Sequence, residues 1–252
     1  TTLRFLGMMK DISFLSMITN NAELIILVSS LVIIILVCFI YKVSLRKNCS
    51  LLIMKKKNFR TFSWGILKGS LLAFFSLSII LLILMIFDLS FITFTESSRI
   101  ILLFSLIVTI ISAFSEELLF RSFLVDILRS LGTRKAIIIA SLSFSIAHVF
   151  NLGYNFLAAV NLFLISIILC YFYIHDEHLG VPVGFHTSWN VIIYHILGFE
   201  VYGYAKPSLF STRVISNNYI ITGGAFGIEA SILTTFSWAI LLCLVVLIKK
   251  KQ

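Results

Sequence analysis

Long apolar runs separated by short charged segments set the hydrophobic pattern of this chain. Three runs are almost free of charge and are as long as the about 20 apolar residues that a membrane-spanning helix needs: Leu24–Tyr41, Ile66–Phe87 and Ile228–Ile248. Four further runs, three of them short for a span, hold most of the polar residues at membrane depth: Ile100–Ser115, Ala136–Phe150, Phe156–Tyr173 and Val183–Leu197. The pattern predicts an all-α, polytopic membrane helical bundle with about seven transmembrane helices.

The first twenty residues follow a different pattern. Apolar residues between Leu3 and Leu15 are interleaved with Arg4, Lys10 and Asp11. Such a mixture is typical of a helix that lies in the membrane interface rather than across it. We therefore expect an N-terminal interfacial helix ahead of the first span.

The composition agrees with a protein dissolved in lipid. Of the 252 residues, 60% are hydrophobic and 12% are charged, whereas soluble domains are about 45–50% apolar and about 25% charged. These values exclude a disordered chain, a secreted disulfide scaffold and an ordinary soluble enzyme. No Pro-, Gly- or Ser-rich linker divides the sequence, so residues 1–252 are predicted to form a single membrane domain. The four cysteines include no Cys-x-x-Cys pair, and we expect no disulfide.

The net charge of +9 is explained by the places where Lys and Arg gather. They lie in the loop after the first span, in Arg129–Lys135 and in Lys249–Lys251, and basic loops stay on the cytoplasmic side. We therefore expect a multi-pass cell-membrane protein with its N-terminus outside and its C-terminus in the cytoplasm. A basic balance can also indicate nucleic acid. Because the bases cluster at span ends, we expect contacts with the lipid bilayer and no nucleic-acid partner.

Two neighbouring glutamates follow the run Ile100–Ser115. Glu117 and Arg121 are four apart and share a helix face, so they can pair and lower the cost of burying both charges. Glu116 lies about 100° away around the helix and faces something else. Low dielectric makes an unpaired carboxylate a stronger base, which suits general acid–base work. The alternative is that both glutamates lie in water at the cytoplasmic end of a span.

A histidine lies at the matching depth on the next predicted helix. The turn between the two helices is expected near Gly132, with Glu116 sixteen residues before it and His148 sixteen residues after it. In an antiparallel pair, residues equidistant from the turn lie at equal depth, so these two can face each other. A lone histidine is more often a packed core residue, and the matched depth is what favours a functional role here.

A second His/Asn cluster lies in the run Val183–Leu197. His186 and Asn190 are four apart and project from one helix face, which suits an oxyanion site built from two donors. The alternative is simple hydrogen bonding between helices. His195 is expected to face elsewhere or toward the interface. By residue counting, His148 lies near the external end of its span and His186 near the internal end, and the sequence leaves open whether they meet.

At these residues the chain resembles the CAAX protease and bacteriocin-processing proteins, also called the CPBP or Abi family. The family motifs Glu-Glu-x-x-x-Arg, Phe-x-x-x-His and His-x-x-x-Asn read here as Glu116–Arg121, Phe144–His148 and His186–Asn190. They lie within a core of roughly residues 100–197. The run Gly223-Gly224-x-x-Gly227-x-Glu229 also looks like a family feature, although its glutamate can equally be a favourable charge at a helix N-terminus.

The resemblance implies an intramembrane endopeptidase. Glu116 would activate a water with help from His148, whereas His186 and Asn190 would hold the oxyanion. Glu117 and Arg121 would support or orient these groups. The family has been described both as metal-dependent and as glutamate-type, and Glu116, His148 and His186 could form a zinc site with an open position. The dry, charge-poor pocket and the nearby Asn190 favour the scheme that uses no metal cofactor.

Other functions are compatible with the same residues. One is a bacteriocin self-immunity or scaffolding protein that acts by binding a partner in the membrane. Another is a proton-coupled transporter, because Glu and His also form proton relays, although the sequence shows no inverted repeat. A peptide or membrane-protein substrate is expected, and prenylated C-terminal motifs, bacteriocin leaders and pheromone precursors all stay open. The low Pro content and the high Ile, Phe, Lys and Asn content indicate an AT-rich bacterium.

Overall fold

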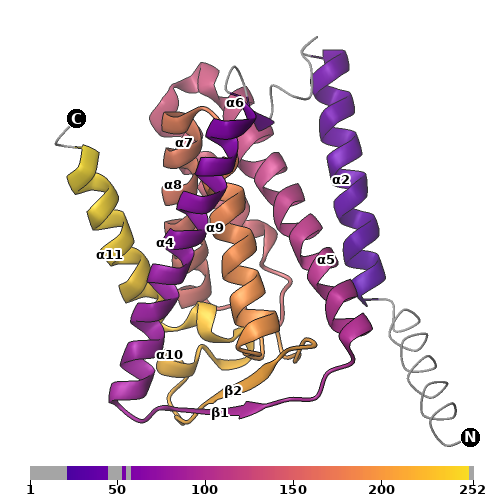
Figure 1. Cartoon of the computed structure of the whole chain (residues 1–252). Helices are drawn as coiled ribbons and strands as arrows, with labels where there is room; N and C mark the ends of the chain where they lie inside the picture. Colours follow the sequence, from indigo (N-terminus) through magenta and orange to yellow (C-terminus); the bar gives the residue numbers. More distant parts are fainter. Residues whose placement is uncertain (1–21, 45–52, 55–57, 250–252) are drawn as a thin grey trace, which may run out of the picture.

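In the computed structural model, which describes residues 22–44, 53–54 and 58–249, the chain forms a helical bundle with a small sheet at one end (Figure 1). One helix matches each of the predicted apolar runs: α2 (Ala22–Ser44), α4 (Phe59–Ile86), α5 (Arg99–Glu117), α7 (Thr133–Ala147), α8 (Phe156–Asp176), α9 (Gly180–Asn190) and α11 (Ile232–Lys249). Consecutive members of this set run in opposite directions (Figure 1). The predicted helical membrane fold is confirmed, and the N-terminal interfacial helix falls outside the described residues.

The predicted number of spans is confirmed only in part. Four helices of the described chain can cross a membrane by length and composition: Ala22–Val43, Phe59–Ile86, Arg99–Leu131 and Phe156–Asp176. α7 has 15 residues and is about 22 Å long at a rise of 1.5 Å per residue, which is less than the about 30 Å of a bilayer core. The chain is a multi-pass membrane protein, and seven spans stay a prediction.

A two-stranded antiparallel sheet, absent from the prediction, closes one end of the bundle (Figure 1). β1 (Ser90–Phe94) pairs with β2 (Phe210–Val214), with Ile92 opposite Thr212. Four of the five residues of β1 are aromatic or β-branched, which favours a strand. The run is too short to stand out beside the long apolar helices, so the all-α prediction needs this correction.

The connection from β2 to α11 is a series of tight turns. It contains α10 (Tyr219–Thr222) and two 3₁₀ turns, Gly224–Phe226 and Ile228–Ala230. Gly223, Gly224 and Gly227 have φ values of 80°, 61° and 92°, a conformation that costs glycine little. The last span was predicted to begin at Ile228, but these turns delay the start of its helix to Ile232.

α9 is positioned by an unusually close crossing with α4. Gly65 of α4 lies against Gly180 of α9, and Gly184 of α9 lies against the Ile66 backbone of α4. A Cβ on Gly69 would come within 2.2 Å of the Val181 carbonyl oxygen. Small residues spaced four apart let two membrane helices approach at backbone distance. The crossing therefore fixes the depth and rotation of α9, which carries two of the predicted site residues.

Two π-helical segments follow the predicted site residues along the chain. α5 continues after Glu117 as a π-helix over Leu118–Leu124, before α6 (Val125–Leu128) and a 3₁₀ turn at Arg129–Leu131. α9 continues after Asn190 as a π-helix over Val191–Ile196. π-helical turns are rare and are often found at functional sites. The expected turn at Gly132 is confirmed, since its φ of 96° separates the 3₁₀ turn from α7.

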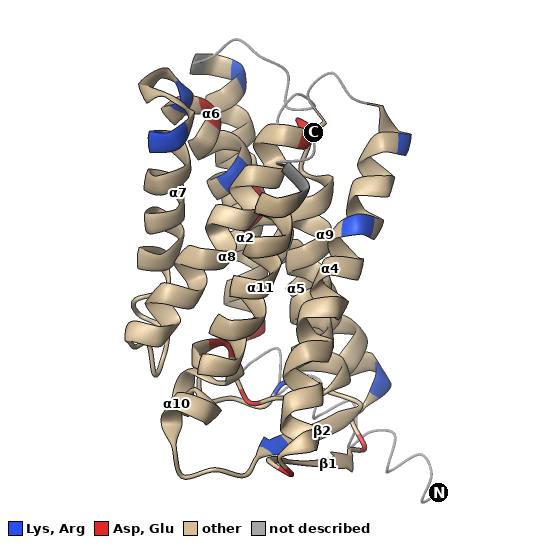
Figure 2. Cartoon of the chain, turned by 90° about the vertical axis from the view of Figure 1, so that its left-hand side faces the viewer, with Lys and Arg blue, Asp and Glu red and all other residues tan. Residues whose placement is uncertain are grey.

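Lys and Arg are distributed unevenly along the bundle (Figure 2). Most of those in the described residues lie toward the end where α6 and the start of α7 are found, and fewer lie near β1 and β2. Cys170 and Cys243 are free thiols, whereas Cys49 falls outside the described residues.

Candidate active site

Glu117 is the buried anchor of the site. Its Oε1 lies 3.1 Å from Nη1 of Arg121, and both side chains have no exposed surface. The Arg121 guanidinium also lies over the ring of Phe144, 3.9 Å from the ring centre. A buried ion pair needs such close compensation because both charges have left water. The pair predicted from the spacing of four residues is therefore present.

The same carboxylate holds an imidazole from α9. Nδ1 of His186 lies 2.6 Å from Glu117 Oε1. Because a carboxylate only accepts hydrogen bonds, His186 must donate from Nδ1. This bond fixes the orientation of the ring and leaves its Nε2 facing the other glutamate.

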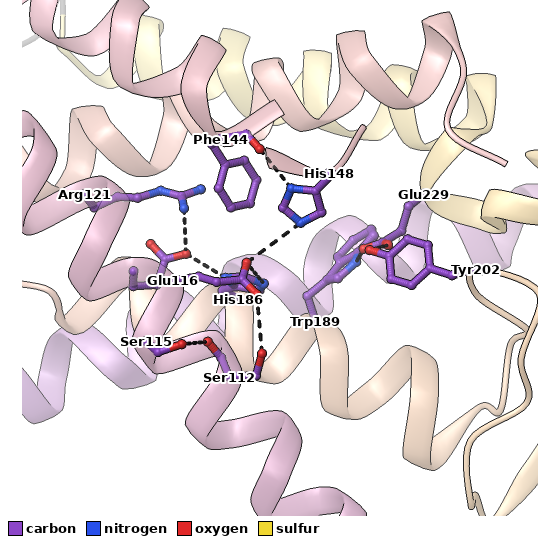
Figure 3. A network of polar contacts seen from close by, with 11 residues as sticks. Ser112, Ser115, Glu116, Arg121, Phe144, His148, His186, Trp189, Tyr202 and Glu229 are labelled. Atoms are coloured by element: carbon purple, nitrogen blue, oxygen red, sulfur yellow. Dashed lines mark hydrogen bonds and ion pairs between the residues drawn. The ribbon is translucent and has the colours of Figure 1, made fainter. Parts of the chain in front are cut away.

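His148 is oriented in a comparable way by the backbone. It follows the last residue of α7, and its Nδ1 donates to the Phe144 carbonyl oxygen at 2.8 Å. Its Nε2 therefore points toward Glu116, 3.9 Å from Oε2 (Figure 3). The expectation that Glu116 and His148 face each other across an antiparallel helix pair is confirmed.

Glu116 is the point at which the two histidines meet. Its Oε2 lies 4.0 Å from Nε2 of His186 as well as 3.9 Å from Nε2 of His148. Oε2 is buried and has no hydrogen-bond partner among the described residues, whereas Oε1 accepts a long bond of 3.4 Å from the Ser112 hydroxyl. The side chain is 27% exposed, so this carboxylate is the more accessible of the two.

Residue counting placed His148 and His186 near opposite ends of their spans, but in the structure both lie at the depth of Glu116. α7 is short and ends before it reaches the level of β1 and β2 (Figure 2). His148 therefore lies inside the bundle rather than at its outer surface. His186, in the second turn of α9, reaches the same level because of the close crossing with α4.

Asn190 lies one helical turn after His186, on the same face of α9. Its side chain is half-buried and forms no hydrogen bond with any residue that the structure describes. The structure thus brings five of the six predicted residues into direct contact as one network. It leaves Asn190 beside that network with its amide unused.

The three candidate zinc ligands do not fit a metal in this arrangement. Ligands of a tetrahedral zinc with bonds of about 2.0–2.2 Å lie about 3.3–3.6 Å from one another. The Glu116 oxygen is 3.9 and 4.0 Å from the two imidazole nitrogens. Among the described residues, no group of three or more His, Cys, Asp or Glu could hold a metal ion.

A third carboxyl lies next to the site, that of Glu229 in the glycine-rich run, which was expected to be either a family feature or a charge at a helix N-terminus. Glu229 is 6% exposed, and its Oε1 accepts a 2.8 Å bond from Nε1 of Trp189. Its Oε2 accepts a 3.3 Å bond from the Tyr202 hydroxyl (Figure 3). The sequence offered two signals, the place of Trp189 directly before Asn190 and the place of Glu229 in the glycine-rich run. Neither signal indicates that Trp189 and Glu229 meet.

His195 belongs to a separate buried cluster, so it faces elsewhere, which is the first of the two expected positions. Its Nε2 lies 2.9 Å from the Thr109 hydroxyl, and Nδ1 donates to the Pro207 carbonyl. Lys206 lies beside it, with Nζ 3.5 Å from Thr109 Oγ1 and 3.8 Å from Oε1 of Glu23. Burial lowers the pKa of the Lys206 ammonium, and the Glu23 carboxylate partly opposes this effect.

Comparison with known proteins identifies the segment that holds the site. Residues 98–192 match the model of a family described as type II CAAX prenyl endopeptidase Rce1-like. The matched segment contains every predicted site residue: Glu116, Glu117, Arg121, His148, His186 and Asn190. No curated protein shows significant sequence similarity to the chain.

Proposed function

We propose that the chain, whose residues 98–192 match the model of the Rce1-like family of type II CAAX prenyl endopeptidases, is an intramembrane endopeptidase in which Glu116 activates water. One observation carries this proposal. Two imidazole nitrogens, from His148 and His186, lie 3.9 and 4.0 Å from one buried oxygen of Glu116. Polar groups at such a separation are well placed to be bridged by a single water molecule.

In the first step, Glu116 Oε2 accepts a proton from that water. His148 already donates from Nδ1 to the Phe144 carbonyl, so its neutral ring presents the Nε2 lone pair. That lone pair accepts the second hydrogen of the water and orients the oxygen for attack. The oxygen then bonds to the carbonyl carbon of the scissile peptide, as general-base catalysis requires.

His186 and Asn190 stabilise the oxyanion that results. To donate from Nε2, His186 must carry protons on both nitrogens, because Nδ1 already donates to Glu117. A carboxylate at 2.6 Å stabilises this doubly protonated ring, as the acid of a catalytic triad does. The amide of Asn190, which forms no hydrogen bond among the described residues, supplies the second donor.

The tetrahedral intermediate then collapses with the same proton that Glu116 removed. The carbon–nitrogen bond breaks, and Glu116 delivers this proton to the leaving amine nitrogen. The products are a new carboxyl group and a new amine. Glu116 is returned to its ionised state, so the cycle consumes one water and needs no other co-reactant.

We place the site in the cell membrane of a bacterium, with a peptide or membrane-protein substrate, and we keep the count of about seven spans. The alternating helices support an odd number of crossings between the start of α2 and the end of α11. The basic end of the bundle would be cytoplasmic. Single cysteines in the loop between β1 and α5 and after Arg129, labelled with an impermeant maleimide in intact cells, test this orientation.

The function is tested with the full chain in proteoliposomes. The substrates are single-spanning peptides with and without a prenylated C-terminal cysteine, and cleavage is followed by mass spectrometry in ¹⁸O-labelled water. The wild-type chain should place one ¹⁸O in the new carboxyl group. Glu116→Gln and His148→Ala should abolish or strongly reduce cleavage. Glu96→Gln, which changes an exposed carboxyl in a loop, is the matched control.

Two outcomes would replace the proposal. If the Glu116→Gln and His148→Ala chains cleave as fast as the wild type, the catalytic assignment is wrong. If no peptide is cleaved but cells expressing Glu116→Gln are still protected from a bacteriocin, the chain acts by binding a partner. Proton flux into liposomes that Glu116→Gln abolishes would instead indicate a transporter.

A further inference from the structure

A small cavity lies beside His186, between α8, α9 and α11. Aliphatic residues of α8 and the aromatic rings of Phe185, Trp189 and Trp238 form most of its wall. The polar residues that line it are Arg121, His186 and Glu229. The cavity therefore begins next to the proposed reaction centre and contains a carboxyl that the mechanism does not use.

The Glu229 carboxyl is held firmly in place. Trp189 and Tyr202 each donate to one of its oxygens. The backbone on either side is fixed by Asn161, whose amide donates to the carbonyls of Glu229 and Ser231 at 2.7 and 3.0 Å. A functional group fixed by its neighbours in this manner is pre-organised for recognition.

The charge of this carboxyl has no cationic partner among the described residues. Glu117 is compensated by Arg121, whereas no Lys or Arg forms an ion pair with Glu229 in the described chain. With Glu116 included, three carboxyls face a single guanidinium around the site. When the three are ionised and His186 is doubly protonated, as the proposed mechanism requires, the site carries an excess of one negative charge. A buried charge without compensation is costly, so the site favours a positively charged ligand.

A second unsatisfied group lines the same cavity. Nε1 of Trp238 is buried and has no hydrogen-bond acceptor among the described residues. Buried polar atoms are normally paired, and each exception calls for an explanation. A carbonyl group of a bound peptide would provide the missing acceptor. A carboxyl that lacks a cation and an indole that lacks an acceptor thus both indicate a ligand in this cavity.

We propose that the cavity is a specificity subsite for a lysine or arginine side chain of the substrate, next to the scissile bond, with Glu229 receiving the charged group. This assignment rests on the proposed endopeptidase function for the meaning of the scissile bond. The long apolar stem of such a side chain would lie along the aliphatic wall from α8. The charged group would meet Glu229 at the end of the cavity that Trp189 and Trp238 line.

The first experiment compares side chains of one shape with and without charge. Peptides that carry lysine, arginine or norleucine at each position flanking the cleaved bond are cleaved by the chain in proteoliposomes. One position should show at least a tenfold higher kcat/KM for lysine than for norleucine. In Glu229→Gln this ratio should fall at least tenfold. Glu200→Gln, which changes an exposed carboxyl on the other side of the Gly227 turn, should keep it.

The second experiment measures binding without cleavage. Butylammonium and butylguanidinium should raise the thermal unfolding midpoint of the wild-type and Glu200→Gln chains, whereas 1-pentanol should not. Glu229→Gln should lose the response. If that variant does not fold, Glu229→Asp serves instead, because its shorter side chain keeps the negative charge but holds it farther from the cavity. Glu229→Asp should move the preference from lysine toward the longer arginine.

The outcomes separate the subsite from the proposed function. If the cations bind in a Glu229-dependent manner but no peptide is cleaved, the endopeptidase is wrong and the subsite stands. The subsite is wrong if pentanol acts like the cations, or if Glu229→Gln keeps the full response. It is also wrong if peptides are cleaved but the ratio of lysine to norleucine does not depend on Glu229.

Discussion

Glu117 and His186 are joined by a 2.6 Å bond between Oε1 and Nδ1, and the same oxygen also lies 3.1 Å from Nη1 of Arg121. One carboxylate oxygen therefore serves both the buried guanidinium and the imidazole that faces Glu116. This arrangement separates the two adjacent glutamates by role. In the proposed mechanism Glu117 orients His186, whereas Glu116 is the general base, and its buried Oε2 has no hydrogen-bond partner among the described residues.

The first prediction concerns Glu117→Gln. The amide oxygen can still accept the proton of His186, but the negative charge that stabilises the doubly protonated ring is lost. We expect the cleavage rate to fall by about 10–100-fold, as for loss of a charged hydrogen bond. We also expect a loss of about 3–5 kcal/mol of stability, because Arg121 is left unpaired. Rates in proteoliposomes and thermal or denaturant unfolding in detergent measure the two effects.

Glu116→Gln is the matched comparison for this variant. It should lower the rate by a factor of about 10²–10⁴ or more, as loss of a general base does. Its stability should change little, because Oε2 of Glu116 has no hydrogen bond to lose among the described residues. The division of roles would be refuted if the two variants lost equal stability.

The second prediction is a double-mutant cycle on the buried pair. Arg121→Met alone leaves Glu117 as an uncompensated buried charge and should also cost about 3–5 kcal/mol. The double variant Glu117→Gln, Arg121→Met removes both charges, so it should be at least as stable as either single variant. Activity should not return in the double variant, since His186 has lost the Glu117 carboxylate there, as it has in Glu117→Gln alone. Additive losses of stability would mean that the two residues do not act as a pair.

Local spacing allowed much of the site to be predicted. A separation of four residues placed Glu117 and Arg121 on one helix face, and equal distances from Gly132 brought Glu116 and His148 to one level. Both rules depend only on helix periodicity and an antiparallel turn. For the same reason, apolar runs of sufficient length indicated where the long helices lie.

Features that depend on distant contacts could not be predicted in this way. The π-helical turn after Glu117 and the 15-residue length of α7 change helix depth without an obvious sequence signal. The pairing of β1 with β2 joins segments more than one hundred residues apart. The position of Glu229 beside Trp189 depends on the glycine-rich turn before α11, whose path the sequence does not specify.

The third prediction tests the crossing that sets the depth of α9. In Gly69→Ala the new Cβ would lie 2.2 Å from the Val181 carbonyl oxygen, so the helices must separate. We expect a loss of about 1–3 kcal/mol from overpacking, although alanine by itself favours a helix. Cleavage should fall as well, because His186 moves away from Glu116. Thermal unfolding and cleavage rates are measured together.

Ser78→Ala is the control for this substitution. Ser78 is on the same helix, and its hydroxyl donates to the Phe74 carbonyl of that helix and to no other residue that the structure describes. This variant should keep both stability and activity. If Gly69→Ala behaves in the same way, the crossing does not fix the site.

The last prediction concerns pH and the buried Lys206. Burial lowers the pKa of this ammonium below its ordinary value of 10.5, while Glu23 partly opposes the shift. Between the lowered pKa and 10.5, the unfolded chain holds the proton and the folded chain has released it. Stability therefore rises as pH increases through this window. Thermal unfolding midpoints measured over alkaline pH should show the contribution, and Lys206→Met should remove it.

Glu23→Gln tests the other influence on the pKa of Lys206, which is the nearby carboxylate. Without the carboxylate, the pKa of Lys206 should fall further, so the rise in stability should begin at lower pH. Lys68→Met removes an ammonium whose side chain is 51% exposed, and it should leave the pH dependence as in the wild type. An unchanged slope in Lys206→Met would show that another group causes the dependence. An unchanged onset in Glu23→Gln would show that the contact of 3.8 Å between Lys206 and Glu23 carries no electrostatic weight.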